Sequence, residues 1–208
     1  MYNIVQKMDN NLFGKGKEKI LACFYRNRNK EMYFSEILRQ TGLTQNTTLK
    51  HLQKLQENKL IFSTKKIGHT FYRINEKNPI IYSIFSYFDN KKFLELPFER
   101  RSAIIEFLDN ASVKPLMCVV FGSTAKGTYT HESDIDILLV YNKDESVDKK
   151  LIKDIEAVTG TNIQPFVIDI DYFTEQLLKK EDKVFMHAIK TGFVVRGSAY
   201  YYREVLHG

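Results

Sequence analysis

A short apolar run in the second half of the chain ends abruptly in a Gly-Ser turn. Residues 116–121 are continuously apolar, a pattern typical of a strand that is buried on both faces. Gly122 and Ser123 follow at once. Ten residues then separate Ser123 from Asp134, and Asp134 and Asp136 stand at the start of a second, mostly apolar segment that runs to Val140. We therefore expect a strand, a tight turn into a helix, a loop, and a second strand that starts with two acids.

The spacing of the two acids indicates a metal site. Residues i and i+2 of a strand point the same way, so Asp134 and Asp136 share one side while Ile135 and Ile137 enter the core. Carboxylates about 7 Å apart along a strand repel each other unless a cation lies between them. Because Mg²⁺ prefers oxygen ligands and keeps substrate phosphates, we expect both acids to bind Mg²⁺ or Mn²⁺ and to be catalytic.

The Gly-Ser turn suits a nucleotide. Gly122 permits a sharp turn and a close approach of the backbone, and the Ser123 hydroxyl with the following helical N–H groups suits the β- and γ-phosphates. Lys126, one turn later, either adds positive charge at this site or is only solvated. A structural alternative makes Gly-Ser an ordinary turn and Asp134 a loop cap, but it gives the acid pair no purpose.

Together, the turn, the ten-residue spacing, the acid pair and the apolar strand resemble nucleotidyltransferases of the DNA polymerase β superfamily. The closest resemblance is to the minimal nucleotidyltransferase branch, which includes antitoxins that adenylylate their partner toxins, over roughly residues 100–208. It implies a polymerase-β-like domain with a mixed β-sheet. It also implies an NTP substrate, expected to be ATP, whose nucleoside monophosphate is transferred to a hydroxyl of a protein or a small molecule.

One departure from this family leaves the enzymatic activity open. Members supply a third carboxylate from a later strand, expected here at 162–169, and Gln164 aligns with that acid. Asp169 is the nearest substitute and is taken as the third catalytic residue, whereas Asp171 is expected to be the N-cap of the next helix. His187 is interpreted as a core or surface histidine.

Charge divides the chain into two expected domains, 1–78 and 79–208. The first holds 15 Lys and Arg against 6 Asp and Glu, a net charge of +9, whereas the second holds 16 against 19, a net charge of −3. A basic first third indicates a polyanionic partner, although chance clustering of surface lysines is the alternative.

The basic segment shows the order of elements of a winged helix-turn-helix. Helical spacing, caps and a Gly-containing turn predict helices over 15–26, from Ser35 to Gly42 and from Thr44 to about 58, then strands over 60–64 and 70–74. Across roughly 14–76 the pattern resembles small prokaryotic winged-helix regulators, which implies binding to double-stranded DNA.

The third helix is expected to supply the DNA-binding face. The helical period places three leucines and one amide inward, with Leu55 near the edge of that side: Leu49, Leu52, Gln56 and Leu60. The other face carries groups that can contact base edges and phosphates: Asn46, Thr47, Lys50, His51 and Lys54. Lys65 and Lys66 at the hairpin tip are expected over the flanking backbone. The alternative is that these residues are merely solvated.

Between the domains, Pro79 begins a helix with an apolar stripe: Ile80, Ile81, Ile84, Phe85 and Phe88. A second helix follows Leu96-Pro97 with four inward residues: Ile104, Ile105, Phe107 and Leu108. Such stripes pack against a neighbouring domain or a second subunit, so a homodimer is one expectation.

We also expect a cytoplasmic protein that does not enter a membrane. Residues 1–11 are polar, and no apolar run approaches the roughly 20 residues that span a bilayer. Cys23 and Cys118 lie among apolar neighbours and are expected to be reduced core residues.

The sequence thus predicts an α+β protein that joins a winged helix-turn-helix to a nucleotidyltransferase. The alternatives are a nucleotide-sensing transcription regulator with a catalytically reduced domain and an antitoxin that regulates its own operon.

Overall fold

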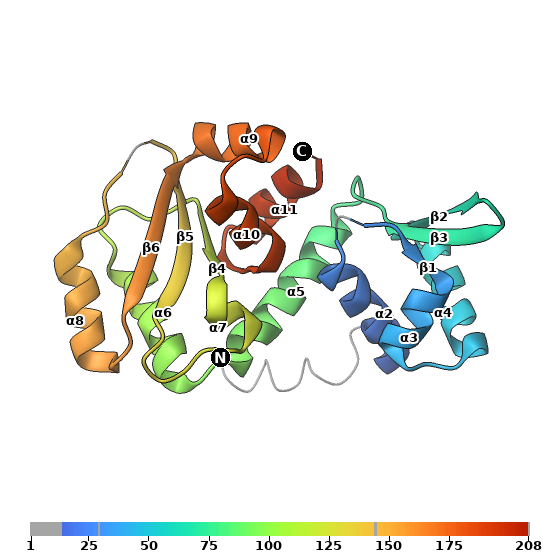
Figure 1. The fold of residues 1–208 in the computed structure, drawn as a ribbon, viewed down its shortest axis with the longest axis horizontal. Coiled ribbons are helices and arrows are strands. Elements are labelled where there is room, and N and C mark those ends of the chain that lie inside the picture. The colour runs from blue at the N-terminus through green and yellow to red at the C-terminus, as the bar shows by residue number, and fades with distance from the viewer. Residues whose placement is uncertain (1–13, 29, 144, 208) are drawn as a thin grey trace. The chain divides into compact units, whose positions relative to one another are not determined.

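The computed structural model describes residues 14–28, 30–143 and 145–207, and the chain forms two compact units, Met1–Phe85 and Ser86–Gly208 (Figure 1). The division falls inside the helix α5 (Ile80–Glu95). Residues 1–11, for which no secretory signal is expected, lie outside the described residues. In the described part, no helix is both long and apolar enough to cross a bilayer.

The first unit joins three helices to a small antiparallel sheet. Its elements are α2 (Lys15–Arg26), β1 (Met32–Tyr33), α3 (Phe34–Thr41), α4 (Gln45–Glu57), β2 (Ile61–Lys66) and β3 (His69–Ile74), with strand order β1-β3-β2. The helix α3 begins earlier than predicted, because Tyr33 rather than Ser35 is the N-cap and its N–H donates to Glu36 at 2.9 Å. The two-residue strand β1 was missed, since it is too short to show a period.

The helix α4 begins as predicted but turns a different side inward. Thr44 is its N-cap and accepts a hydrogen bond from the N–H of Thr47. The buried residues are Thr48, Leu52 and Leu55, whereas Leu49, predicted to be inward, is 43% exposed. Burial of Thr48 is tolerated because its hydroxyl donates to the carbonyl of Thr44 at 2.9 Å.

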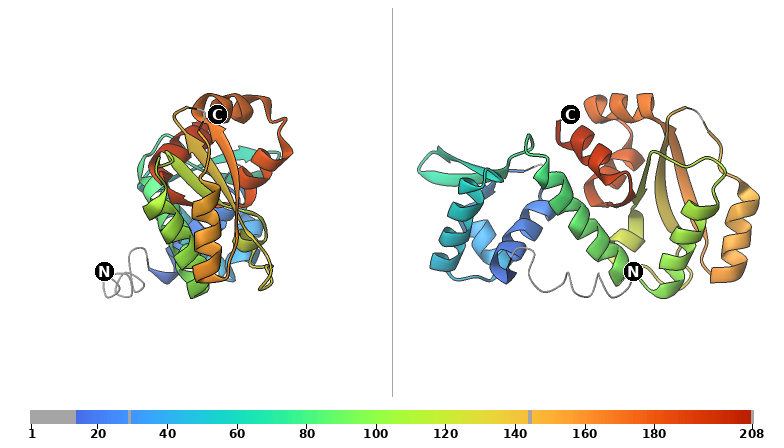
Figure 2. Two further views of the ribbon diagram at one scale, coloured as in Figure 1. Left: turned by 90° about the vertical axis from the view of Figure 1, so that its left-hand side faces the viewer. Right: turned by 180° about the vertical axis from the view of Figure 1, so that it is seen from behind.

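The second unit is a mixed sheet with helices on both faces, which confirms the predicted mixed α and β architecture (Figure 2). Its elements, after α5, are α6 (Phe98–Asn110), β4 (Met117–Val120), α7 (Gly122–Lys126), β5 (Ile135–Tyr141), α8 (Lys149–Thr159), β6 (Ile163–Asp169), α9 (Ile170–Lys179), α10 (Lys183–Thr191), β7 (Phe193–Arg196) and α11 (Ser198–His207). The strand order is β6-β5-β4-β7, in which β5 and β6 are parallel and the other pairs antiparallel.

The strand β5 separates two packed layers. Its odd-numbered residues, Ile135 to Tyr141, join the core that α6 and α8 cover, and Cys118 is buried in the same core. The helices α10 and α11 contact β4. Because side chains alternate along a strand, Asp136 points away from the α6 and α8 layer. This alternation decides which elements can reach the acid pair.

The stripe on α5 is buried within a single chain. Ile81, Ile84, Phe85 and Phe88 are at most 6% exposed, while Ile80, predicted to belong to the stripe, is 55% exposed. On α6, Ile104 and Phe107 are buried as predicted, but Ile105 is 46% exposed. The α5 stripe therefore offers little free apolar surface to a second subunit, and the homodimer stays a prediction.

Candidate functional site

The turn after β4 lies directly against Asp136. Gly122 has a φ of 65°, a conformation that L side chains rarely adopt, and a Cβ at this position would lie 1.9 Å from Oδ2 of Asp136. The preceding N–H, that of Phe121, donates to the carbonyl of Asp136 at 2.9 Å. The glycine is therefore required twice, once by its backbone conformation and once by the neighbouring carboxylate.

The structure brings the two acids together as the sequence predicts. Asp136 is half-buried and Asp134, the residue before β5, is exposed. Burial, followed by the charge of Asp134, raises the pKa of Asp136, and His187 opposes this effect. Asn162, just before β6, donates to Asp134 at 3.3 Å. The ionised pair is thus held at an electrostatic cost that a bound cation would offset.

These residues fit a divalent metal that carries a nucleotide. The donor set is two carboxylates on one side of β5, beside a backbone turn with no Cβ. Among the described residues, no group of three or more His, Cys, Asp and Glu is arranged to hold a metal, so phosphate oxygens and water would complete the coordination. Ser123 is half-buried at the start of α7 and Lys126 is exposed at its end.

The position expected for a third carboxylate is held by Gln164. In the parallel pairing of β5 and β6, Gln164 is the direct neighbour of Asp136, and the side chain is exposed. Neighbours in register point to the same face, so Gln164 lies beside the acid pair. This register agrees with the alignment made from the sequence.

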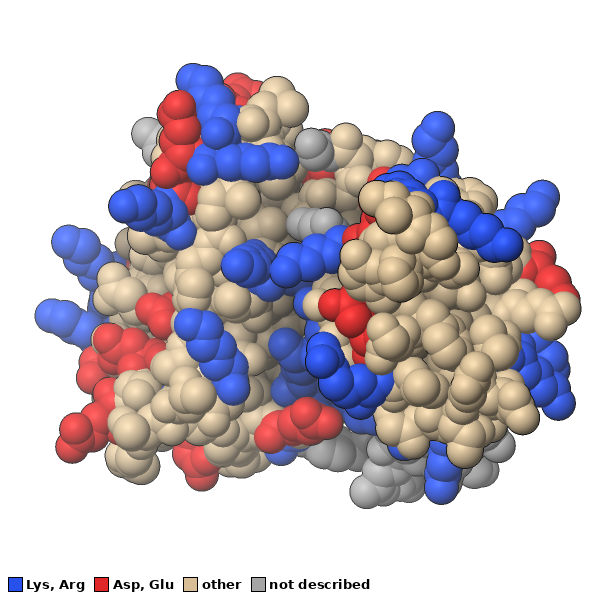
Figure 3. Space-filling view, turned by 45° about the vertical axis from the view of Figure 1, so that its right-hand side comes forward, with Lys and Arg blue, Asp and Glu red and all other residues tan. Residues whose placement is uncertain are grey.

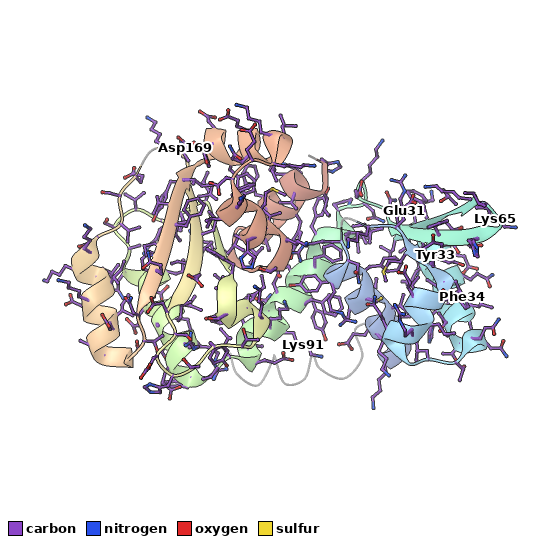
Figure 4. The ribbon with its side chains drawn as sticks, viewed as in Figure 1. Glu31, Tyr33, Phe34, Lys65, Lys91 and Asp169 are labelled. Carbon is purple, nitrogen blue, oxygen red and sulfur yellow. The ribbon has the colours of Figure 1, made fainter. Side chains whose placement is uncertain are left out.

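Asp169 is not the substitute acid that the sequence suggested. It pairs with Tyr141, five residues beyond Asp136 along the strand, which puts it about 16 Å away and on the opposite face. Its carboxylate instead accepts the N–H of Tyr172 at 2.7 Å, so Asp169, rather than Asp171, is the N-cap of α9. Figure 4 shows Asp169 where β6 passes into α9.

Arg100, which the sequence interpretation missed, holds the loop between α7 and β5. It is 4% exposed and donates to the carbonyls of Thr130 at 3.0 Å and Ser133 at 2.6 Å. It also donates to the hydroxyl of Thr124 at 2.8 Å, and its guanidinium lies 4.2 Å from the ring centre of Tyr129. Burial lowers its pKa, an effect that Tyr129 and Asp134 oppose.

His187, interpreted from the sequence as a core or surface histidine, lies near the site. It stands on α10, a helix that contacts α7, and its ring centre lies 6.2 Å from that of Phe121, next to the Gly122 turn. It is close enough to oppose the rise in the pKa of Asp136. Nothing local signals this, because tertiary packing alone brings α10 to the site.

The predicted DNA-binding residues are only partly arranged as expected. Asn46, Lys50 and Lys54 are exposed on α4, whereas the hydroxyl of Thr47 is bonded to Thr44 at 2.8 Å. His51, predicted to be exposed, is half-buried: a Cβ at Gly16 on α2 would lie 2.2 Å from its Nε2. Burial and neighbouring lysines, Lys17 first, lower the pKa of His51, which favours the neutral ring.

The two lysines of the hairpin differ in their surroundings. Lys65 lies at the tip, as Figure 4 shows, and is exposed. Lys66 pairs with Glu31 at 2.6 Å and lies 5.4 Å from the ring centre of Phe71, although its side chain is still 52% exposed. On the face drawn in Figure 3, the blue Lys and Arg side chains cover more of the surface than the red Asp and Glu side chains do.

Comparison with known proteins finds a match within the second unit. Residues 100–199 match the family model for the nucleotidyltransferase domain. No curated protein matches the chain, and no solved structure matches it. Residues 100–199 are therefore similar to the nucleotidyltransferase domain, and this range includes the Gly122 turn, both acids, Gln164 and Arg100.

Proposed function

We propose that the protein transfers a nucleoside monophosphate from an NTP, with ATP as the expected donor, to a hydroxyl group. The observation that carries this proposal is the placement of Asp136 against the Gly122 turn and close to the charge of Asp134, within a range matched to the nucleotidyltransferase domain. The match to the nucleotidyltransferase domain supports nucleotidyl transfer in general. The donor and the acceptor are the proposed parts.

The reaction makes distinct demands on the chain. The oxygen of the acceptor hydroxyl bonds to the α-phosphorus, the bond from that phosphorus to pyrophosphate breaks, and the hydroxyl proton passes to a base. Asp134 and Asp136 would hold a divalent ion, which neutralises phosphate charge when it is bound. The N–H groups that follow Gly122, with the Ser123 hydroxyl, would orient the departing phosphates, and Lys126 is close enough in sequence to assist.

The test is turnover with ATP labelled at the α-phosphate. Purified protein, Mg²⁺ and labelled ATP are incubated with and without cell lysate, and pyrophosphate release and labelled product are measured. We expect transfer by the wild type and none by the double variant Asp134→Ala, Asp136→Ala. Undiminished transfer by that double variant would overturn the site assignment.

A second candidate function is nucleotide sensing without transfer, and Gln164 is the observation that favours it. An amide beside Asp136 binds metal poorly and accepts no proton at neutral pH, so this position supplies neither a third ligand nor a base. In that case ATP binds with Mg²⁺ but releases no pyrophosphate with any acceptor. The variants Gln164→Glu and Gln164→Asp should then show measurable transfer. If both variants bind ATP but transfer nothing, the domain lacks more than this one carboxylate.

We also propose that the first unit is a winged helix-turn-helix that binds double-stranded DNA. The order of α2, α3, α4 and the β2–β3 hairpin supports this, together with the exposed polar face of α4 at Asn46, Lys50 and Lys54.

The affinity for duplex DNA should fall with salt at a log–log slope of about −0.9 per neutralised phosphate. Because Lys66 already pairs with Glu31, Lys65→Ala should flatten the slope more than Lys66→Ala. If neither variant changes the slope or the affinity, the hairpin does not contact the backbone.

A further inference from the structure

The tip of the β2–β3 hairpin carries an apolar side chain that packs against nothing. The two strands pair up to Lys66 and His69, which leaves Ile67 and Gly68 as a two-residue turn. Ile67 is 99% exposed, the most exposed of the large hydrophobic residues in the described part of the chain. Its side chain therefore gains no burial within this unit.

The same residue is also in an unfavourable backbone conformation. Ile67 has a φ of 48° and Gly68 a φ of 77°, and positive values at both central positions define a type I′ turn. Asn or Gly is favoured at the first of these positions, whereas a β-branched residue there is strained. The chain thus places a strained and exposed isoleucine where a polar residue would make a more stable hairpin. Strain of this kind concentrates at functional positions.

The hairpin beneath the tip is well supported. Tyr33 of β1 contacts two residues of β3. The centre of its ring lies 5.8 Å from the ring centre of His69 and 4.2 Å from that of Phe71. Lys66 is held by its ion pair with Glu31. Figure 4 shows Glu31 and Tyr33 in the body of the first unit and Lys65 out at the tip. Ile67 is therefore presented on an anchored ribbon.

The charge around the tip indicates the partner. Lys65 and Lys66 immediately precede Ile67, and residues 1–78 carry a net charge of +9. A polyanion is the surface that such a tip would meet, and an apolar side chain flanked by cations suits the minor groove of DNA. There, isoleucine is among the side chains that wedge between base steps and kink the duplex by about 20–90°.

We propose that Ile67 is an apolar wedge that enters the minor groove of double-stranded DNA while Lys65 contacts the adjacent phosphates. This inference rests on the proposed DNA-binding function and adds to it the part played by the hairpin tip. Insertion of Ile67 bends the duplex. In the free protein, the same residue lowers the stability of the hairpin.

The experiment uses the full chain and a 30-base-pair duplex of alternating A·T, whose TA steps unstack easily. Affinity is measured by fluorescence anisotropy over a range of salt concentrations, and bending by energy transfer between dyes at the two duplex ends. For Ile67→Asn we expect affinity to fall by about tenfold to a hundredfold, the equivalent of one buried isoleucine, and bending to be lost. The salt slope should stay unchanged because the lysines remain, and the thermal midpoint should rise because Asn suits the turn.

Two further variants sharpen the result. Ile67→Leu keeps an apolar wedge and should bind and bend nearly as the wild type does. Val158→Asn is the matched control, since Val158 on α8 is also an exposed β-branched residue, at 82% exposure, but lies in the second unit. It should leave DNA binding unchanged.

Each contrary outcome has a separate meaning. If the wild type binds but Ile67→Asn binds and bends the duplex equally well, the wedge is overturned and DNA binding stands. If the wild type binds no duplex even at low salt, the DNA-binding function and the wedge are overturned together. A lower thermal midpoint for Ile67→Asn would show that Ile67 supports the fold, which would also overturn the wedge.

Discussion

At Gly122 the backbone conformation and the neighbouring space can be tested separately, because Gly127 at the other end of α7 shares only the first. Both glycines have a positive φ, but a Cβ at Gly127 would meet nothing within 4 Å. We expect Gly127→Ala to cost about 1 kcal/mol of stability through strain alone. Gly122→Ala should cost more and should also abolish Mg²⁺-dependent ATP binding, since Asp136 must move.

The two alanine variants are compared by urea unfolding and by ATP titration with Mg²⁺. If Gly122→Ala bound ATP as tightly as Gly127→Ala does, the turn would not be part of the nucleotide site.

At Asp136 the raised pKa gives a pH dependence with a defined sign. Between its ordinary pKa and the raised value, the folded protein holds a proton that the unfolded chain releases, so stability falls as pH rises through that window. Without metal, Asp136→Asn should therefore be more stable than the wild type at neutral pH. The difference should disappear well below pH 4, where Asp136 is protonated in both states.

The same variant should lose the stabilisation that Mg²⁺ and ATP give to the wild type, because an amide is a poor, uncharged ligand. Thermal unfolding across pH, with and without Mg²⁺ and ATP, measures both effects, with Asp154→Asn on the exposed side of α8 as the control. A variant that was less stable than the wild type at neutral pH would contradict the electrostatic cost at the site.

What the sequence could predict about the site follows from the range of each interaction. Asp134, Asp136 and Gly122 were predicted because turn, spacing and strand period are local properties. The pairing of Gln164 with Asp136 required a strand register, and the error at Asp169 arose because nearness in sequence did not reveal which end and face of β6 it occupies. His187 reaches the site only through packing of α10.

At the scale of elements, Arg100 connects α6 with the loop that carries the chain from α7 to β5. It lies on the buried stripe of α6 at helical spacing from Ala103, Ile104 and Phe107, so a periodic pattern that admitted a charged residue would have found it. The carbonyl of Ser133 accepts from this side chain, and the carbonyl of Thr130 accepts both from it and from the N–H of Ser133.

Replacing Arg100 should therefore destabilise the second unit strongly. We expect Arg100→Met to reduce the free energy of unfolding by roughly 2–4 kcal/mol, because it removes the buried donors to the Thr124 hydroxyl and to the carbonyls of Thr130 and Ser133. Arg100→Lys should recover only part of this loss, since an ammonium lacks the planar fork of donors. Urea unfolding measures the change, and Arg101→Met is the control, because Arg101 makes one exposed bond to the carbonyl of Leu94. Equal losses in the two Met variants would contradict the role of Arg100.

The elements themselves were predictable where their pattern was long. The caps at Thr44 and Gly42, the hairpin and the buried strand before Gly122 were confirmed. The predicted inward face of α4 included Leu49, which is exposed, and omitted Thr48, which is buried with its hydroxyl bonded within the helix. Such choices depend on what α2 and α3 present, and a single helix does not contain that information.

For the whole molecule, the uneven charge and the two compact units predict that the two proposed ligands act on different segments. A ligand that binds only the folded state stabilises it by about 2.7 kcal/mol at a hundredfold excess over its dissociation constant. We expect Mg²⁺ with ATP to slow hydrogen exchange over 117–141, the turn and the acid pair. Duplex DNA should instead slow exchange over 45–69, which covers α4 and the hairpin tip.

Peptide-resolved hydrogen exchange on the full chain measures both patterns in one experiment. Asp136→Asn should remove the protection by ATP and leave that by DNA, while Ile67→Asn should weaken only the protection by DNA. Protection of 117–141 by DNA in the absence of nucleotide, with no change over 45–69, would place the polyanion in the acidic second unit and contradict the division of roles. That outcome is disfavoured by charge, because residues 79–208 carry a net −3 and repel a phosphate backbone, whereas residues 1–78 carry +9 and attract it.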